Sequence, residues 1–372
     1  MDTEIKRVMV TGAGGTVGDY VVDELLKGGY EVIAIDLPGK HLKKRHGKLG
    51  KNMIFVEGDL CDSEFVHRCV IEHSPDAIIH TAALIDLAAP REKLIRVNYE
   101  MVVDLYTALR FNAGKIFVHF SSCSIYDNAK VRTERTGFRA DSPYEESKIM
   151  AEKYLNGSAK EHSAPYDPKI VILRPSLIYG PANKFLAANY LGIAIILGEL
   201  FKESLPRFSG GPRTNMVHAE DVARAAVFLM ENEATWKRGL ANAFNIADDS
   251  NWGFGEQLTA IQAACGYKIN SIPFPLPSAK IIRLFRGIYE SPLFLKAFNR
   301  ALKIIWNSIV KEYKLKRKFV PEIDKGMTGY FGNDTVFSNE KIKKAGFHLL
   351  HPNFRKGILS VIQWYRDRKW IP

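Results

Sequence analysis

The fold is decided by Val8-Met-Val-Thr-Gly-Ala-Gly-Gly-Thr-Val-Gly18, an apolar run that leads into three spaced glycines and then a helical pattern. Gly12 permits a tight turn, Gly15 lets backbone N–H groups approach a pyrophosphate, and Gly18 lets the helix pack closely on the strand. The free N–H groups and the dipole at the start of such a helix favour an anion. The stretch therefore predicts a strand, a turn and a helix that bind a dinucleotide.

Short strand patterns alternate with helical patterns through the first half of the chain. The expected strands are β-branched or aromatic and bounded by turn residues, and they cover residues 8–10, 31–35, 53–56, 77–80, 116–120 and 170–173. The expected helices between them cover residues 17–27, 64–72, 92–110 and 144–155. This alternation predicts an α/β fold, a Rossmann-type doubly wound parallel sheet, whose ligands bind beyond the carboxyl ends of the strands.

The alternation breaks near residue 180. Residues 181–214 suggest a mixture of apolar segments and loop, a strand and a helix return at 216–218 and 220–230, and another strand follows at 243–246. A helix is expected at 253–265, a rigid proline break at 273–277 and a final helix at 354–369. We expect a dinucleotide-binding domain over residues 1–180, joined again by 214–250, and a smaller interleaved region over 181–372 that mainly binds substrate.

The charge and the cysteines limit the classes of function. The 372 residues are 46% hydrophobic and 25% charged, as in an ordinary globular protein, and the formal net charge is +11. The four cysteines form no Cys-x-x-Cys pair and no histidine cluster accompanies them, so no metal site is expected. Such sparse cysteine predicts a cytoplasmic location. The longest apolar run, residues 191–197, is far shorter than the roughly 20 residues that span a bilayer.

The cofactor preference rests on the end of the second expected strand. A carboxylate at Asp36 can accept both hydroxyls of the adenosine ribose and repels a 2′-phosphate, which predicts NAD. Basic residues nearby leave NADP as the alternative: Lys40, Lys43, Lys44 and Arg45. Asp59 follows the third strand, where a turn or helix-capping role and an adenine contact are both open.

A tyrosine, a lysine and a serine form the candidate catalytic set. Tyr144 and Lys148 are four residues apart, so they share one face of a helix, and the ammonium group can lower the phenol pKa and hold a ribose. An acidic phenol can exchange a proton with a substrate oxygen. Ser122 ends the preceding strand, where its hydroxyl can hydrogen-bond the reacting oxygen, and Ser124 is the alternative.

Together these motifs resemble the extended short-chain dehydrogenase/reductase superfamily, of the NAD-dependent epimerase/dehydratase kind. The resemblance runs over about residues 5 to 250, more weakly to the end, and rests on residues 11–18, 58–60, 80–83, 98, 121–126, 143–148, 173–181 and 217–223. It implies catalysis by Ser122, Tyr144 and Lys148. It implies cofactor contacts at Gly12, Gly14, Gly15, Thr16, Val17, Gly18, Asp36, Asp59, Leu60, Ala82, Ala83, Asn98, Tyr144, Lys148 and Pro175.

The resemblance also bears on the surroundings of the site. It implies that His218 and Asp221 belong to the scaffold rather than to a metal site or a triad, and that the chain forms a homodimer through the helices near 92–110 and 144–155. The family usually has Tyr-Gly where this chain has Tyr126-Asp127.

Two branches of the superfamily fit the remaining motifs. Residues 80–87, 178–186 and 247–250 look like 3β-hydroxysteroid dehydrogenases, which implies hydride transfer between a sterol or other apolar secondary alcohol and the nicotinamide. The alternative is a UDP- or dTDP-sugar epimerase or dehydratase, in which Lys184, Arg207 and Arg213 would grip a diphosphate. Dehydratases commonly have an Asp-Glu pair where Cys123-Ser124 stands here, so epimerisation is favoured over dehydration.

The basic surplus admits two further hypotheses. Residues 279–318 combine apolar side chains with Lys and Arg, so they could line an apolar pocket, make a peripheral contact with an anionic membrane, or form core helices with charged outer faces. A non-catalytic NAD-binding protein is a remote alternative, against which the intact catalytic set argues. The chain has no known nucleic-acid-binding motif, so we expect no specific nucleic-acid partner.

Overall fold

The computed structural model describes residues 5–39, 51–86, 89–184, 186–202, 204–237, 239–316, 319–323, 327–328 and 332–372. The basic residues on which the NADP alternative rests, Lys40, Lys43, Lys44 and Arg45, therefore lie outside the described residues. So do Leu87 and Phe185 of two motif runs and residues 317–318 of the basic stretch.

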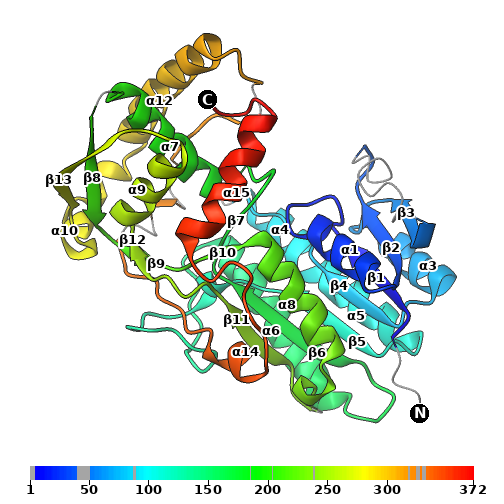
Figure 1. Cartoon of the computed structure of the whole chain (residues 1–372). Helices are drawn as coiled ribbons and strands as arrows, with labels where there is room; N and C mark the ends of the chain where they lie inside the picture. Colours follow the sequence, from blue (N-terminus) through cyan, green and yellow to red (C-terminus); the bar gives the residue numbers. More distant parts are fainter. Residues whose placement is uncertain are drawn as a thin grey trace.

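A seven-stranded parallel sheet forms the centre of the first region, in the order β11-β6-β5-β4-β1-β2-β3 (Figure 1). Its strands in chain order are β1 Arg7–Thr11, β2 Glu31–Asp36, β3 Met53–Glu57, β4 Ala77–His80, β5 Ile116–Phe120, β6 Lys169–Pro175 and β11 Asn242–Ile246. The strand order reverses beside β1, which pairs with both β2 and β4. The predicted Rossmann-type doubly wound sheet is confirmed.

Helices cover both faces of this sheet, because its central strands are apolar on both sides. All residues of β4 and β5 are buried, as is typical of parallel strands. On one face, α1 (Gly18–Lys27) and α8 (Ala219–Glu231) pack on the sheet. On the other lie α3 (Ser63–His73), α5 (Met101–Phe111) and α6 (Pro143–Glu161).

The single helix expected over residues 92–110 has three parts. It consists of α4 (Arg91–Ile95), a π-helical turn (Arg96–Glu100) and α5. Such a turn inserts a residue into the helical ladder and re-aims side chains, often at functional sites. Asn98 lies within it and is buried.

The second region has its own apolar core. Four helices contribute to it, and Trp306 and Tyr365 are among its fully buried side chains: α7 Leu186–Leu200, α9 Phe254–Ala264, α12 Pro292–Glu312 and α15 Phe354–Asp367. Three two-stranded sheets complete the region and join it to the first: β7 Leu177–Tyr179 with β10 Met216–His218, β9 Arg213–Thr214 with β12 Trp252–Gly253, and β8 Leu205–Gly210 with β13 Ile269–Leu276.

One expectation for this region is made more precise, and another is wrong. The mixture of apolar segments and loop expected over residues 181–214 contains α7 and β8. α7 is apolar nearly all round because it is buried, so it lacks the periodicity of a surface helix. Residues 273–277 are not a plain break, because β13 continues through Pro273 and Pro275 and pairs with β8. Proline is tolerated in a two-stranded sheet, where each strand is an edge strand.

The remaining helices lie at the surface of these two cores. α14 (Glu340–Lys344) returns to the first region, where Ile342 packs in the core beside α8. α10 (Ala279–Leu284) and α11 (Arg286–Tyr289) lead into α12 on the outer side of the second region (Figure 1). Within the described residues, no helix is both long and apolar enough to cross a bilayer.

Candidate active site

The glycine turn is shaped so that only glycine fits. Gly12 has a φ of +68°, and a Cβ there would lie 2.8 Å from the backbone of Ala82. A Cβ on Gly18 would lie 2.1 Å from the carbonyl oxygen of Gly12. The turn therefore brings the start of α1 against the end of β1, and Thr16 and Val17 lie in it directly before the helix. This is the geometry expected of a pyrophosphate cradle.

Asp36 lies beside this turn at the end of β2. Its carboxylate accepts hydrogen bonds from the amide of Gly14 at 2.7 Å and from the amide of Leu37 at 2.8 Å. A carboxylate offers about four lone-pair sites, so two remain for ribose hydroxyls. The structure thus brings two predicted cofactor residues into direct contact.

Other predicted cofactor residues lie at the ends of neighbouring strands. Asp59 forms a turn, since its carboxylate accepts from the amide of Cys61 at 2.9 Å, while Asp62 caps α3. Leu60 is buried in the core. Ala82 and Ala83 follow β4, and Pro175 ends β6. Contact of these residues with a cofactor stays a prediction.

Asn98 has a structural role that the sequence did not indicate. Its amide accepts from the backbone of Leu84 at 2.8 Å and donates to the Leu84 carbonyl at 3.0 Å and to the Ser147 hydroxyl at 3.1 Å. The side chain is 1% exposed. It fastens the segment after β4 to the helix that carries the catalytic candidates.

The first turn of α6 places Tyr144 beside Ser122. The Ser142 hydroxyl accepts from the Glu145 amide, and Pro143 takes the first helical position, where its missing N–H is harmless. The half-buried phenol of Tyr144 is hydrogen-bonded to the side chain of Ser122. Ser122 also donates to the Ser124 hydroxyl at 2.9 Å. Of the two serine candidates, the structure therefore joins Ser122 to the tyrosine.

Lys148 lies one helical turn further and is almost fully buried. Its Nζ donates to the carbonyl oxygen of Phe120, the last residue of β5, at 2.8 Å. The ammonium group thus reaches the carboxyl end of the central sheet. Ser122 and Tyr144 are therefore in contact, and Lys148 is bonded to Phe120, two residues before Ser122. Their joint role in catalysis stays a proposal.

The electrostatics of this set differ from the expectation. We expected the ammonium group to lower the phenol pKa, but burial raises the pKa of Tyr144 to about 12, with the hydrogen bond to Ser122 acting in the opposite direction. Burial lowers the pKa of Lys148 to about 8, and the negative charge of Glu152 opposes this change. In both groups the apolar surroundings disfavour the charged form.

A buried ion pair anchors α6, and sequence reasoning missed it. Arg174 on β6 donates from Nε to a carboxylate oxygen of Glu152 at 2.8 Å and from Nη2 to the other oxygen. Arg174 also donates to the Tyr126 hydroxyl at 2.8 Å, which in turn donates to Asn245 at 2.5 Å. Glu152 follows Lys148 by four residues, so helical spacing was the available signal. The pair fixes α6, which carries Tyr144 and Lys148, to the sheet.

Two neutral histidines lie beneath Lys148. His80 on β4 and His119 on β5 have ring centroids 5.8 Å apart, and Thr11 Oγ1 lies 2.7 Å from His80 Nδ1. Burial lowers the pKa of His80 to about 3 and the pKa of His119 in the same direction, and the charge of Lys148 adds to both effects. The histidines therefore stay uncharged at neutral pH and leave Lys148 as the cation of this cluster.

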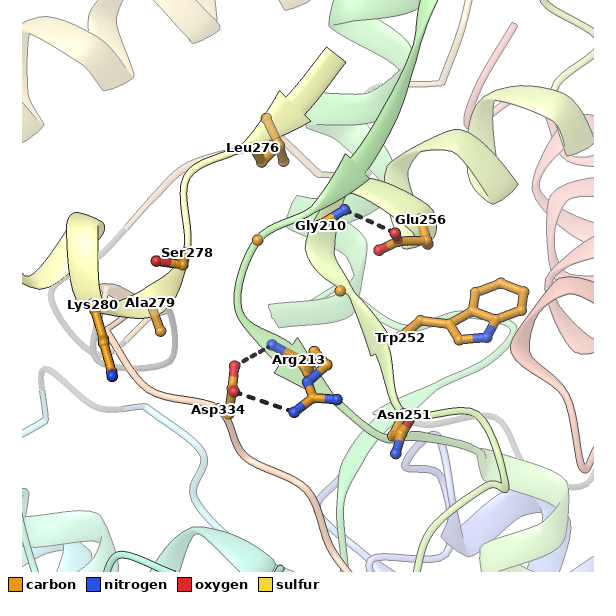
Figure 2. A pocket seen from close by; sticks show the side chains of 12 residues that line it. Gly210, Arg213, Asn251, Trp252, Glu256, Leu276, Ser278, Ala279, Lys280 and Asp334 are labelled. Carbon is orange, nitrogen blue, oxygen red and sulfur yellow. Dashed lines mark hydrogen bonds and ion pairs between the residues drawn. The ribbon is translucent and has the colours of Figure 1, made fainter. Parts of the chain in front are cut away.

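A cavity of about 590 Å³ opens in the second region. In Figure 2 the side chain of Arg213 points toward Asp334, whose carboxylate accepts from the Arg213 amide at 2.9 Å, and Lys280 lies on the α10 side. Of the three expected diphosphate contacts, only Arg213 lines the cavity. Lys184 lies over the ring of Trp370 instead, 5.8 Å from its centroid, and Arg207 lies on β8 opposite Pro273.

A second cavity, of about 340 Å³, shares Asp334 with the first. Asn128 and Arg132 also line it, and they belong to the loop that follows Ser122 and Tyr126 along the chain. Arg132 donates to the backbone carbonyl of Asp334 at 2.9 Å. The loop after Ser122 is thereby connected to the cavity of the second region.

One group in the described part of the chain could hold a metal ion: His218, Glu220 and His351. Glu220 Oε2 lies 2.8 Å from His351 Nε2, and the Glu220 amide donates to His218 Nδ1 at 3.2 Å. Asp221 accepts from the backbone amides of Leu350 and His351. These contacts attach the segment before α15 to the start of α8, as a scaffold role for His218 and Asp221 implies.

Comparisons with known proteins match the part of the chain that forms the seven-stranded sheet. The model of the NAD dependent epimerase/dehydratase family matches residues 8–247. UDP-glucose 4-epimerase of Caenorhabditis elegans is 30% identical over 297 residues, covering 70% of this chain and 84% of that protein. UDP-glucose 4-epimerase of Bacillus subtilis strain 168 is 25% identical over 287 residues, covering 70% and 83%. The solved UDP-glucose 4-epimerase of Thermotoga maritima with UDP-glucose has a TM-score of 0.67 at 20% identity, covering 97% and 99%, so the fold is shared over the second region too.

Proposed function

Because the chain belongs to the NAD dependent epimerase/dehydratase family, as its motifs predicted, we propose that it epimerises a nucleotide sugar with NAD as the bound hydride carrier. Membership makes it an NAD-dependent enzyme of the extended short-chain dehydrogenase/reductase type. The observation that carries the proposal is the hydrogen bond between Tyr144 and Ser122, with Lys148 on the same helix bonded to Phe120 at the carboxyl end of β5.

The residues around the glycine turn fit NAD. A Cβ at Gly12 or Gly18 would collide with neighbouring backbone atoms. Because these residues have no side chain, the backbone can approach a pyrophosphate. Asp36 would hold the adenosine ribose, and its charge favours NAD over NADP because it repels a 2′-phosphate. Lys148 would hold the nicotinamide ribose.

The side chains have separate parts in the chemistry. Bound NAD supplies a hydride acceptor that can return the hydride to either face of the oxidised sugar carbon. Tyr144 must enter this step as the phenolate, which requires release of its own proton when cofactor and sugar bind, because burial raises its pKa. Its Oη then takes the proton from the sugar hydroxyl and gives it back to the same oxygen after the sugar has turned. Ser122 hydrogen-bonds the same oxygen, and Lys148 stabilises the deprotonated phenol. The neutral His80 and His119 place no second cation beside Lys148.

The substrate class is supported by the relatives and by the cavity. The most similar curated proteins reported above are UDP-glucose 4-epimerases, which supports the nucleotide sugar better than the sterol that we expected from the motif runs. The cavity of about 590 Å³ is lined by the cationic side chains of Arg213 and Lys280, and Arg213 would exchange its ion pair with Asp334, at 3.7 Å, for contact with a diphosphate. Cys123 points its thiol at the Arg174 carbonyl, so this position offers no acid–base pair for dehydration.

An apolar secondary alcohol is the second candidate. It is favoured by the apolar side chains around the same cavity, since Leu276 lines it and the neighbouring Phe274 on β13 is half exposed. Such a substrate would leave NADH as a product in each turnover, whereas an epimerase regenerates NAD.

The test is to supply the two substrate classes separately. The enzyme with NAD should interconvert UDP-glucose and UDP-galactose, followed by NMR, without net NADH absorbance. Tyr154→Phe removes a hydroxyl from the same helix away from the cleft and should behave as wild type. If a sterol yields NADH and no UDP- or dTDP-sugar is converted, the nucleotide-sugar proposal is wrong and the apolar secondary alcohol takes its place.

We also infer a homodimer, through α5 and α6. The expectation comes from the superfamily and from the position of both helices on one outer face of the sheet. Sedimentation velocity tests it, and a monomer at micromolar concentration would contradict it.

A further inference from the structure

An unusual surface lies on the outer side of the second region, formed by α10, α11 and the first turns of α12 (Figure 1). Six large apolar side chains are exposed on these consecutive helices, and with the basic residues among them they are named the basic apolar face: Ile281, Leu284, Phe285, Ile288, Leu293 and Phe294. Leu284 and Leu293 are 81% and 83% exposed. Contiguous apolar surface of this kind marks an interaction site in a folded protein.

The helical spacing in α12 shows that the exposed side chains are not needed for its packing. Leu302, Trp306 and Ile309 lie on one side and are buried in the core of the second region. At 100° per residue, Leu293 lies opposite Leu302 on the helix and Ile304 nearly so, whereas Phe294 lies about 80° from Leu302, at the edge of the buried side. Leu293 and Ile304 are 83% and 61% exposed, so apolar side chains also lie on the side of α12 that faces away from the core.

The basic apolar face carries a strong positive charge. Residues 279–303 contain six Lys or Arg residues and one acidic residue, Glu290. Arg286 pairs with that glutamate at 2.9 Å, and Arg283 donates to the carbonyl of Gly332. Four cations have no ion pair with any described residue: Lys280, Lys296, Arg300 and Lys303.

We propose that the basic apolar face docks on an anionic phospholipid surface. The apolar side chains would enter the boundary between headgroups and acyl chains, and the unpaired cations would lie at the phosphates, as in other interfacial helices. A second copy of the chain is disfavoured as the occupant, because two such faces would bring like charges together. A bound peptide is disfavoured because neither cavity described above is lined by these apolar side chains.

Docking in this way would bring the substrate cavity to the membrane. Ala279 and Lys280 line the cavity and also begin α10, the first helix of the face. The cavity wall and the docking face are therefore continuous. The inference does not depend on which alcohol the enzyme uses.

Vesicle sedimentation tests the proposal with the full chain. Vesicles of phosphatidylcholine with 30% phosphatidylglycerol should bind the protein, and pure phosphatidylcholine should bind it at least tenfold more weakly. Each basic residue near an anionic surface contributes about fivefold to partitioning. Lys296→Glu/Arg300→Glu should therefore lower binding at least tenfold, and Leu284→Ser/Leu293→Ser should do the same by removing apolar area.

Matched controls separate docking from general surface effects. Ile71→Ser removes an exposed apolar side chain on α3, and Lys344→Glu/Lys356→Glu reverses two exposed charges on α14 and α15. Both should bind vesicles as wild type does, and all variants should retain NAD binding. Absence of binding to the anionic vesicles, or equal loss in the controls, would overturn the proposal. So would vesicle-free self-association that the Leu284→Ser/Leu293→Ser variant abolishes.

Discussion

The two regions of this molecule differ in where they place charged and large apolar side chains. Around the sheet, charged groups such as Lys148, Glu152 and Arg174 are buried, and each has a partner. On the outside of the second region, large apolar groups such as Leu284 and Leu293 are exposed. Burying charges requires strict positioning, which fits the part that we propose for the first region in the chemistry. The exposed apolar side chains and the cavity of the second region fit the parts that we propose for it in substrate binding and docking.

The largest effect should come from removing the proton carrier of the first region. Tyr144→Phe should lower kcat by about 10² to 10⁴, the usual contribution of positioned acid–base catalysis, while the Kd for NAD stays within a few-fold. Sugar turnover and NAD titration measure the two quantities. The control is Tyr154→Phe, which removes a hydroxyl on the same helix, near Thr107. An equal fall of kcat in this control would show that Tyr144 does not carry the proton, and would contradict the catalytic part that we propose for the first region.

A large effect is also expected from filling the glycine turn. In Gly18→Ala the new Cβ would lie 2.1 Å from the Gly12 carbonyl oxygen, so the backbone must shift. The Kd for NAD should rise at least tenfold and the free energy of unfolding should fall by about 1–3 kcal/mol, as for overpacking. Isothermal titration and urea denaturation measure these effects.

Gly157→Ala is the matched control for that change. Gly157 lies within α6, and no atom would lie within 4 Å of its Cβ. Alanine is favoured over glycine in a helix by about 0.5–1 kcal/mol, so this variant should be as stable as wild type or more so. Unchanged NAD affinity in Gly18→Ala would show that the turn does not cradle the cofactor.

The second region should affect substrate affinity rather than chemistry. Arg213→Ala removes a cation from the cavity and should raise KM for a UDP-sugar about tenfold, the loss of one charged hydrogen bond, with kcat nearly unchanged. Arg207→Ala, on β8 but outside the cavity lining, should leave both constants unchanged. A tenfold fall in kcat in Arg213→Ala would instead place this side chain in the chemistry.

The smallest effect concerns the free energy of burying Lys148. Its folded pKa of about 8 lies below the ordinary value of 10.5, so the unfolded chain binds more protons between these pH values and stability rises with pH across that window. The full free-energy cost of burying the charged ammonium group is present below pH 8. Lys148→Met should therefore be more stable than wild type by about 1 kcal/mol at pH 7, since the Phe120 carbonyl loses its partner and offsets part of the gain. Denaturation at pH 7 and pH 10 checks that the advantage shrinks as pH rises. A constant difference would contradict the titration of Lys148.

The sequence predicts those parts of the molecule that depend on local spacing. The glycine turn, the strands of the sheet and the Tyr144–Lys148 pair are readable because each uses a backbone rule within a few residues. The Arg174–Glu152 pair spans 22 residues, and the contact between Arg213 and Asp334 spans 121. Local spacing carries no information about such partners.

Buried elements also lack the sequence patterns by which surface elements are recognised. α7 is enclosed by the second core and therefore lacks an amphipathic period, and the prolines of β13 are accommodated only because its sheet has two strands. The sequence also predicted a lowered phenol pKa, because helical spacing indicates the neighbouring ammonium group and not the desolvation that raises the pKa of Tyr144. The expectation of a sterol substrate was less well supported than the expected fold. The cavity is assembled from segments far apart in the chain, and local motifs do not describe it.

A crystal structure with NAD bound tests the central claim most directly. The account predicts the pyrophosphate at Gly12 to Gly18, the adenosine ribose at Asp36, and the nicotinamide ring in contact with the phenol of Tyr144 beside Lys148. A nicotinamide ring bound elsewhere, with the phenol and ammonium groups still turned toward Ser122 and Phe120, would contradict it.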